Sequence, residues 1–223
     1  MATTVEAAYN AGVTARHVLV QRDDGGTHRV SLRLCTPADK RVLVEVWAPI
    51  LDRGPQEWLD RDWTWNALHA PDQLAFNVAP EWLVLADEVE PDAKGDLIGA
   101  LVTTGPLSPP DASLDIKTVG DETFAWVEYV AIAPSIRKNC PALDRRKVLL
   151  KGVGSQLMMA AIRRSQSLGC NGRVGLHAEG AVAKEAYRAW NMQELPEAPH
   201  PAGGRFPVFF GSADWALKFA ERR

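Results

Sequence analysis

The chain has 223 residues, of which 46% are hydrophobic and 24% charged, and its formal net charge is -3. These values predict a globular protein with one sizeable core, and without a basic excess they give no reason to expect nucleic acid as a partner. Three widely spaced cysteines, Cys35, Cys140 and Cys170, form no metal-ligand pattern and indicate a reducing compartment, so we expect no metal.

The N-terminal sequence carries Glu6 and lacks the apolar segment of a secretory signal, and no apolar run is long enough to span a membrane. We therefore expect a cytoplasmic protein without a membrane partner. Residues 1–27 are expected to form an N-terminal arm, in which Val18–Val20 has the composition of a short strand and 23–26 that of a turn. Residues 28–223 are expected to form one domain.

Local patterns predict strands and helices along that domain. Strands show alternation or short apolar runs, and we expect them at His28–Leu34, Trp82–Ala86, Leu97–Thr103, Thr123–Ala133, Arg173–Ala178 and Phe206–Phe210. Helices follow capping or turn residues, and we expect them from Thr36, the N-cap before Pro37, to about Leu51, around Trp58–Leu68, from about Gly152 to Leu168, at Ala181–Trp190 and at Ala213–Ala220. We expect a loop over Gly105–Gly120. The order indicates an α/β protein with a mixed sheet and helices on its faces.

A glycine turn, Gly152–Val153–Gly154, precedes the longest of these helices. Glycines allow a tight bend and a close approach to a ligand, and the free N–H groups of a helix start bind anionic phosphate. The turn therefore predicts a site for the pyrophosphate of a nucleotide-like cofactor. The alternative is a turn that only starts a helix.

Three blocks resemble the GNAT superfamily of acyl-CoA-dependent N-acyltransferases. Val127–Pro134 is similar to the family's central strand, Lys151–Leu157 to its pyrophosphate loop Gln/Arg-x-x-Gly-x-Gly/Ala, and Ala186–Met192 to its Phe-Tyr-x-x-x-Gly-Phe block. The resemblance implies a central, mostly antiparallel mixed sheet that is flanked by helices and splayed at its central strands. It also implies transfer of an acetyl group from acetyl-CoA to a primary amine, by direct attack in a ternary complex.

The chain departs from the family pattern in three places. Leu149 stands where Gln or Arg is usual, Asn191–Met192 replaces Gly-Phe, and the connection Ile136–Leu150 is stretched and basic. We expect one or two side chains of this insertion to contact the 3′-phosphate of CoA, the alternative being a solvated loop. The basic residues are Arg137, Lys138, Arg145, Arg146 and Lys147.

The resemblance assigns the cosubstrate largely to backbone groups. Val130 N–H would polarise the thioester carbonyl, a contact worth roughly 3 kcal/mol in a dry site, and Ile132 would pair with pantetheine. The groups expected to hold the pyrophosphate are Lys151, Gly152, Val153, Gly154 and Ser155. The alternative for the strand is ordinary ladder hydrogen bonding.

Three side chains are candidates for proton transfer. Tyr187 matches the family tyrosine that protonates the departing CoA thiolate, the alternative being a core tyrosine. Glu128 lies among apolar and aromatic neighbours, which raise a carboxyl pKa, and could deprotonate the acceptor ammonium. It could instead be structural or only bind the cation. His177 is a weaker candidate, since a lone strand histidine is usually just hydrogen-bonded.

The acceptor is expected to be an amine, because the first two helices combine aromatic and acidic residues that suit a cation. Core packing and solvation also explain most of these residues, which are Trp47, Asp52, Glu57, Trp58, Asp60, Asp62, Trp63 and Trp65. The acceptor's identity and the oligomeric state, a homodimer included, stay open. The alternatives are a non-catalytic acyl-CoA-binding or regulatory module and a Rossmann domain, which would need a glycine at Leu157.

Overall fold

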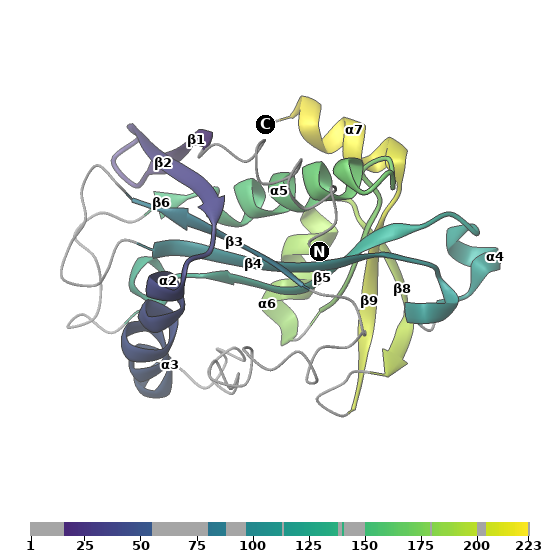
Figure 1. The fold of residues 1–223 in the computed structure, drawn as a ribbon, viewed down its shortest axis with the longest axis horizontal. Helices are drawn as coiled ribbons and strands as arrows, with labels where there is room; N and C mark the ends of the chain where they lie inside the picture. Colours follow the sequence, from purple (N-terminus) through teal and green to yellow (C-terminus); the bar gives the residue numbers. More distant parts are fainter. Residues whose placement is uncertain are drawn as a thin grey trace, which may run out of the picture. The chain divides into compact units, whose positions relative to one another are not determined.

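The structure is a computed structural model that describes residues 16–54, 80–87, 97–112, 114–137, 140, 150–178, 180–199 and 204–222. The strands are β1 (Arg16–Arg22), β2 (Thr27–Leu34), β3 (Glu81–Ala86), β4 (Leu97–Leu107), β5 (Phe124–Ile132), β6 (Leu150–Lys151), β7 (Val174–His177), β8 (Gln193–Pro199) and β9 (Arg205–Gly211). The helices are α2 (Pro37–Val42), α3 (Ala48–Arg53), α4 (Ile116–Val119), α5 (Val153–Ser167), α6 (Gly180–Ala189) and α7 (Ala213–Glu221) (Figure 1).

The described strands form one mixed sheet in the order β6-β1-β2-β3-β4-β5-β7-β9-β8. Strands β5 and β7 are parallel, whereas β1 is antiparallel to β2 and β6, β2 to β3, and β9 to β7 and β8. The expected mostly antiparallel mixed sheet is therefore confirmed. None of the helices among the described residues is both long and apolar enough to cross a lipid bilayer.

The chain divides into two compact units. Unit 1 comprises Met1–Pro55, Trp82–Ala100 and Ala131–Gln156, and unit 2 comprises Gln56–Glu81, Leu101–Val130 and Leu157–Arg223. Strands β4 and β5 and helix α5 each begin in one unit and end in the other, so both units share continuous elements.

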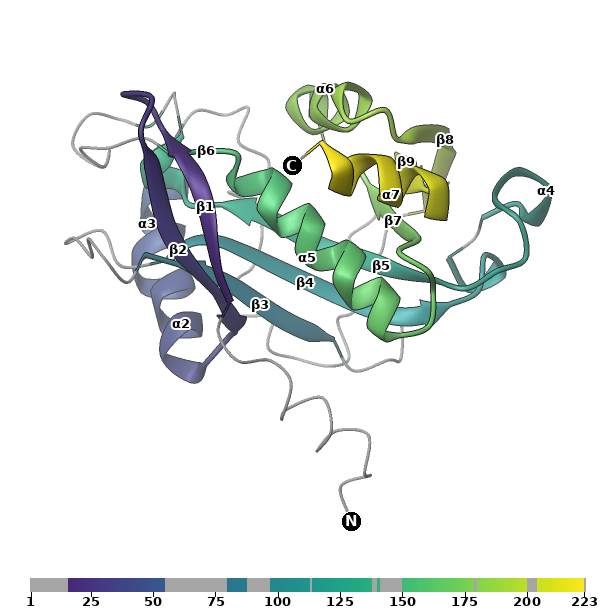
Figure 2. The same cartoon turned by 90° about the horizontal axis from the view of Figure 1, so that it is seen from above.

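Unit 1 begins with the β1–β2 hairpin, which Figure 2 shows as two adjacent strands. Its turn is closed by Asp24, whose side chain accepts from Gly26 N–H at 2.9 Å, and by Gly25, whose φ of +89° favours glycine. The strand expected at Val18–Val20 is present and spans Arg16–Arg22. Part of the segment 1–27 is thus a paired strand.

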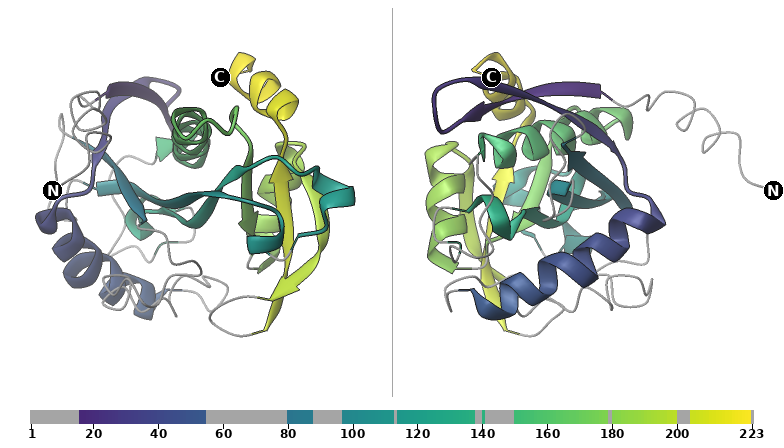
Figure 3. Two further views of the ribbon diagram at one scale, coloured as in Figure 1. Left: turned by 45° about the vertical axis from the view of Figure 1, so that its right-hand side comes forward. Right: turned by 90° about the vertical axis from the view of Figure 1, so that its left-hand side faces the viewer.

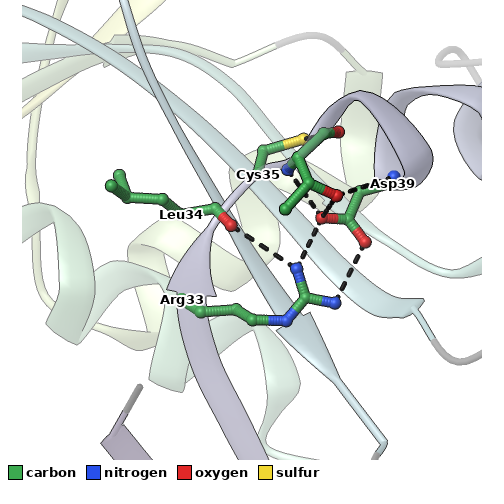
Figure 4. A network of polar contacts seen from close by, with 5 residues as sticks. Arg33, Leu34, Cys35 and Asp39 are labelled. Carbon is green, nitrogen blue, oxygen red and sulfur yellow. Dashed lines mark hydrogen bonds and ion pairs between the residues drawn. The ribbon is translucent and has the colours of Figure 1, made fainter. Parts of the chain in front are cut away.

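The helix start expected at Thr36 and Pro37 is confirmed. Thr36 is the N-cap, and it exchanges hydrogen bonds with Asp39: Asp39 N–H donates to Thr36 Oγ1 at 3.3 Å, and Thr36 N–H donates to Asp39 Oδ2 at 2.7 Å. The Arg33 guanidinium donates to both oxygens of the same carboxylate, from Nη1 to Oδ2 at 2.5 Å and from Nη2 to Oδ1 at 3.0 Å (Figure 4). The helical backbone then continues through a π-helical stretch, Leu43–Trp47, into α3, and the right panel of Figure 3 shows these segments as one continuous helix.

Asp39→Asn is expected to lower the free energy of unfolding by about 2 kcal/mol at pH 7, because it removes the charge from the cap and from the Arg33 pair. Burial raises the pKa of Asp39, but hydrogen bonds from Arg33 and Thr36 outweigh it and hold the pKa below its usual range. Because the pKa of Asp39 is lower in the folded than in the unfolded protein, the ionised carboxylate stabilises the fold above the unfolded pKa of about 4. This stabilisation is lost as the pH falls through the folded pKa. Urea unfolding from pH 7 to pH 3 should show the wild-type advantage shrinking below about pH 4; a constant gap would contradict the assignment.

The loop expected over Gly105–Gly120, in unit 2, was wrong near both of its ends. Strand β4 continues to Leu107, and α4 forms within the segment. The reason is burial: Leu107, Ala112 and Leu114 join a core cluster with Phe124 and Trp126, so scattered apolar residues order a stretch whose composition is polar.

Strands β6 and β8 were not predicted. Strand β6 has only two residues, too few for any alternation. Strand β8 is an edge strand that pairs with β9 (left panel of Figure 3), and a register shift between Leu195 and Glu197 breaks its alternation. Leu195 and Ala198 are nevertheless buried, which explains why this proline-containing segment is a strand.

Candidate functional site

The glycine turn in unit 1 is a strand–turn–helix. Strand β6 pairs with β1 through Lys151–Gln21 and Leu150–Arg22, and α5 begins two residues after Lys151. Gly152 lies between them with a φ of +80°, and the space where its Cβ would stand is open. Only glycine adopts this backbone without strain, so the sharp bend depends on it.

Helix α5 presents its first-turn N–H groups at this turn. The helical hydrogen bonds begin with Gln156 N–H, which donates to Gly152 C=O at 3.0 Å. The N–H groups of Val153, Gly154 and Ser155 come before this first helical hydrogen bond, so they have no acceptor within the helix. Lys151 is exposed beside them. Backbone donors, a helix N-terminus and one cation fit a phosphate group.

The turn is anchored to the N-terminal hairpin. In addition to the β6–β1 pairing, the Gln156 side chain donates to Leu19 C=O at 3.2 Å. Segment 1–27 thus contributes a strand that holds the turn in place. The expected contacts of Lys138, Arg145, Arg146 and Lys147 with the 3′-phosphate, and the departure at Leu149, fall outside the described residues.

The parallel pairing of β5 with β7 ends before β5 does. Among the described residues its register runs from Ala125–Val174 to Val127–Leu176, whereas β5 continues to Ile132. Residues Phe124–Val127 are buried, but the next three, Glu128–Val130, are all half-buried. β7 itself ends at His177. Because consecutive strand residues face opposite sides, β5 is partly exposed on both faces beyond its last pair with β7.

The end of β5, in unit 1, has contacts that the sequence did not predict. Arg137 donates to Ile132 C=O from two nitrogens, at 3.0 and 2.7 Å. Ala133 N–H donates to Ile98 C=O at 3.0 Å. The carbonyl of Ile132 thus already accepts from a guanidinium, and Arg137 lies at the end of β5.

Glu128 is held by a neighbouring strand within unit 2. Thr104, buried on β4, has its hydroxyl 3.0 Å from Glu128 Oε1. Trp126 on β5 is paired with Gly175 on β7, and its ring lies over that glycine. Glu128 and His177 each follow two residues later on these strands, so they lie on the same face of the sheet as Trp126. His177 packs edge-on against Trp126, with ring centroids 5.0 Å apart.

Tyr187 lies on α6 in unit 2 and is 6% exposed. Its ring contacts Trp190 and Phe209, with centroid distances of 5.7 and 5.3 Å. Asn191, which stands at the glycine position of the block that the chain resembles, has a φ of +58°. Asparagine and glycine adopt this left-handed backbone more readily than other residues, so asparagine is compatible with the turn after α6.

Asn191→Val should lower the free energy of unfolding by about 1–2 kcal/mol, because a β-branched side chain is strained at positive φ. Asn191→Gly should stay within about 0.5 kcal/mol of wild type, since glycine relieves the strain but loses more conformational freedom on folding. Urea unfolding of both variants checks the pair. Equal stability of the valine and glycine variants would show that the backbone relaxes at this position.

Cys35 is poorly suited to act as a nucleophile that would carry the acyl group covalently. Burial, together with the neighbouring Asp39 carboxylate, raises the pKa of the Cys35 thiol to about 11. The thiol is therefore protonated at neutral pH and is a poor nucleophile. Within the described segments, no group of three His, Cys, Asp or Glu side chains is placed to hold a metal ion.

The predicted site residues fall into both units. Glu128, Val130 and Tyr187 belong to unit 2, whereas Ile132 and the turn Lys151–Ser155 belong to unit 1. Of the expected acceptor residues, Trp47 is buried in the core and Asp52 is exposed. The others, Glu57, Trp58, Asp60, Asp62, Trp63 and Trp65, lie outside the described residues. Thr104 escaped the sequence analysis, because no local pattern links it to a carboxylate 24 residues away.

No family profile and no curated protein matches the chain. Among solved structures, an uncharacterized protein from Bacillus halodurans is similar at a TM-score of 0.55 and 12% identity, over 94% of this chain and 95% of that one. Arabidopsis thaliana NAA60 in complex with acetyl-CoA is similar at a TM-score of 0.50 and 14% identity, over 81% and 96%. A GCN5-related N-acetyltransferase from Kribbella flavida gives 0.45 and 16%, over 81% and 95%. At these identities the likeness to the first two structures shows the fold alone, and it agrees with the fold that the resemblance to the GNAT superfamily implies.

Proposed function

We propose that this protein transfers an acetyl group from acetyl-CoA to a primary amine, by direct attack of the amine on the thioester. The observation that carries the proposal is the end of the β5–β7 pairing at Val127–Leu176, followed by three half-buried residues of β5. Beyond the end of this pairing, β5 would offer backbone groups and a carboxylate, Glu128, to a ligand. The glycine turn before α5 adds donors that suit a pyrophosphate.

The donor substrate would be held mainly by backbone groups. The N–H groups of Gly152, Val153, Gly154 and Ser155 would bind the pyrophosphate, with Lys151 adding a positive charge. Ile132 would pair with the pantetheine arm, and because its carbonyl accepts from Arg137, we assign that pairing to the Ile132 N–H. Acetyl-CoA supplies the activated acetyl group as a thioester.

Residues of unit 2 would handle the protons and the developing charge. Glu128 would accept a proton from the acceptor ammonium, which leaves a neutral amine able to form the new C–N bond. Val130 N–H would face the carbonyl oxygen as negative charge develops there. Tyr187 O–H would donate its proton to the sulfur as the C–S bond breaks, so that free CoA thiol leaves. The second proton that the attacking nitrogen loses on becoming an amide would return to the Tyr187 phenolate, and the proton on Glu128 would pass to solvent.

The test is release of free thiol from acetyl-CoA across a panel of amines that includes polyamines, amino acids, lysine and peptide N-termini. Thiol release without amine serves as the blank. Amine-dependent release with stoichiometric N-acetyl product supports the proposal. Release that stays at the blank with every amine, together with tight CoA binding, would contradict catalysis.

A second candidate is a non-catalytic acyl-CoA-binding module with the same fold. The deep burial of Tyr187 between Trp190 and Phe209 favours it, since such packing alone explains the residue. Calorimetry separates the two functions, because a binding module would take up acetyl-CoA without consuming it in the presence of amine.

A further inference from the structure

One polar contact of Glu128 comes from a buried strand. Thr104 is 2% exposed on β4, and its hydroxyl lies 3.0 Å from Glu128 Oε1 on β5. A carboxylate offers only acceptors when ionised, whereas a hydroxyl carries one donor. The Thr104 hydroxyl therefore donates to the ionised form of Glu128.

This contact is rigid on the threonine side. Threonine branches at Cβ and has few χ1 rotamers, and here it lies within a strand rather than a loop. The position of the hydroxyl oxygen is therefore set by the backbone of β4, and its O–H can turn toward the carboxylate. A fixed donor restricts the orientations of a carboxylate at this half-buried strand position.

The neighbouring residue gives a natural contrast. Thr103 is equally buried, at 1% exposed, yet its hydroxyl has no hydrogen-bond partner among the described residues. Adjacent strand residues face opposite sides of the sheet, so Thr103 and Thr104 share composition and burial but not the contact with Glu128. The pair offers a matched control within one strand.

We propose that Thr104 is a positioning residue that orients the Glu128 carboxylate and keeps it ionised for proton abstraction from the acceptor amine. This inference rests on the proposed function, in which Glu128 is the base. A donor to the ionised form stabilises that form. Loss of the donor therefore raises the pH at which the base becomes active and loosens its geometry.

Three variants test the role: Thr104→Val removes the hydroxyl with little change of shape, Thr104→Ser keeps it, and Thr103→Val is the control. The pH dependence of kcat/KM is measured for each with the best amine, after thermal melts confirm folding. We expect Thr104→Val to move the acid limb upward by about half to one pH unit and to lower kcat roughly tenfold. Thr104→Ser should restore the limb, and Thr103→Val should leave it unmoved.

An acid limb unchanged in Thr104→Val, or moved equally by Thr103→Val, would overturn the proposal while leaving the acetyltransferase function standing. A second measurement does not depend on activity: the Glu128 carboxyl is titrated by carbon-13 NMR in the wild type, Thr104→Val and Thr104→Ser, with Glu128→Gln used to assign the signal. If no amine supports turnover, the function fails, and this titration decides the contact. An equal Glu128 titration midpoint in wild type and Thr104→Val then overturns it.

Discussion

Gly154→Asp is expected to abolish the thermal stabilisation that CoA gives the wild-type protein. Gly154 is the second residue of α5, half-buried in the turn that presents the first backbone N–H groups of the helix. An aspartate there fills the space for a close approach and adds a negative charge beside the pyrophosphate. Two like charges 4 Å apart near a protein surface repel by about 4 kcal/mol, which corresponds to roughly a thousandfold loss of affinity.

The same substitution should not damage the fold. A carboxylate in the first turn of a helix interacts favourably with the helix dipole, and aspartate has a better helix propensity than glycine. Without CoA, the melting temperature of Gly154→Asp should therefore stay within about 5 °C of the wild-type value. Loss of the CoA response in a folded variant then reports on the site itself.

Ala213→Asp is the matched control, because Ala213 opens α7 as a first-turn residue and receives the same charge. Its response to CoA should equal that of wild type. With CoA at a hundred times its dissociation constant, the wild-type gain is about 2.7 kcal/mol, well above the precision of a melting experiment. If CoA raises the melting temperature of Gly154→Asp as much as that of wild type, the phosphate site is elsewhere.

Tyr187→Phe is expected to lower turnover roughly ten- to a thousandfold while leaving the affinity for CoA nearly unchanged. The substitution removes only the hydroxyl, so the ring keeps its packing against Trp190 and Phe209. A thiolate leaves readily even without protonation. Loss of the proton donor is therefore expected to slow the reaction but not to abolish it.

Steady-state kinetics with saturating amine, together with calorimetry for CoA, check this prediction. A thermal melt of the variant controls for packing, and we expect its free energy of unfolding to change by about 1 kcal/mol or less. An unchanged kcat with the correct amine would remove the proton-donor role and leave Tyr187 as a core residue, as expected of a binding module.

The sequence was sufficient where short-range chemistry decides the structure. The cap at Thr36 depends on Pro37 and on Asp39 three residues later, and the bend at Gly152 depends on one backbone conformation. Both signals lie within a single turn of chain, where capping and steric limits act directly on neighbouring residues. Such local patterns also predicted the described strands other than β6 and β8.

Within each unit, tertiary structure alone decided which groups the candidate residues contact. The pairing of β5 with β7 stops at Val127, Thr104 on β4 meets Glu128 on β5, and Arg137 turns back onto the carbonyl of Ile132. No composition or periodicity encodes these contacts. They arise because the register between distant strands is set by the faces that must be buried together, and that burial depends on the whole core rather than on any one segment.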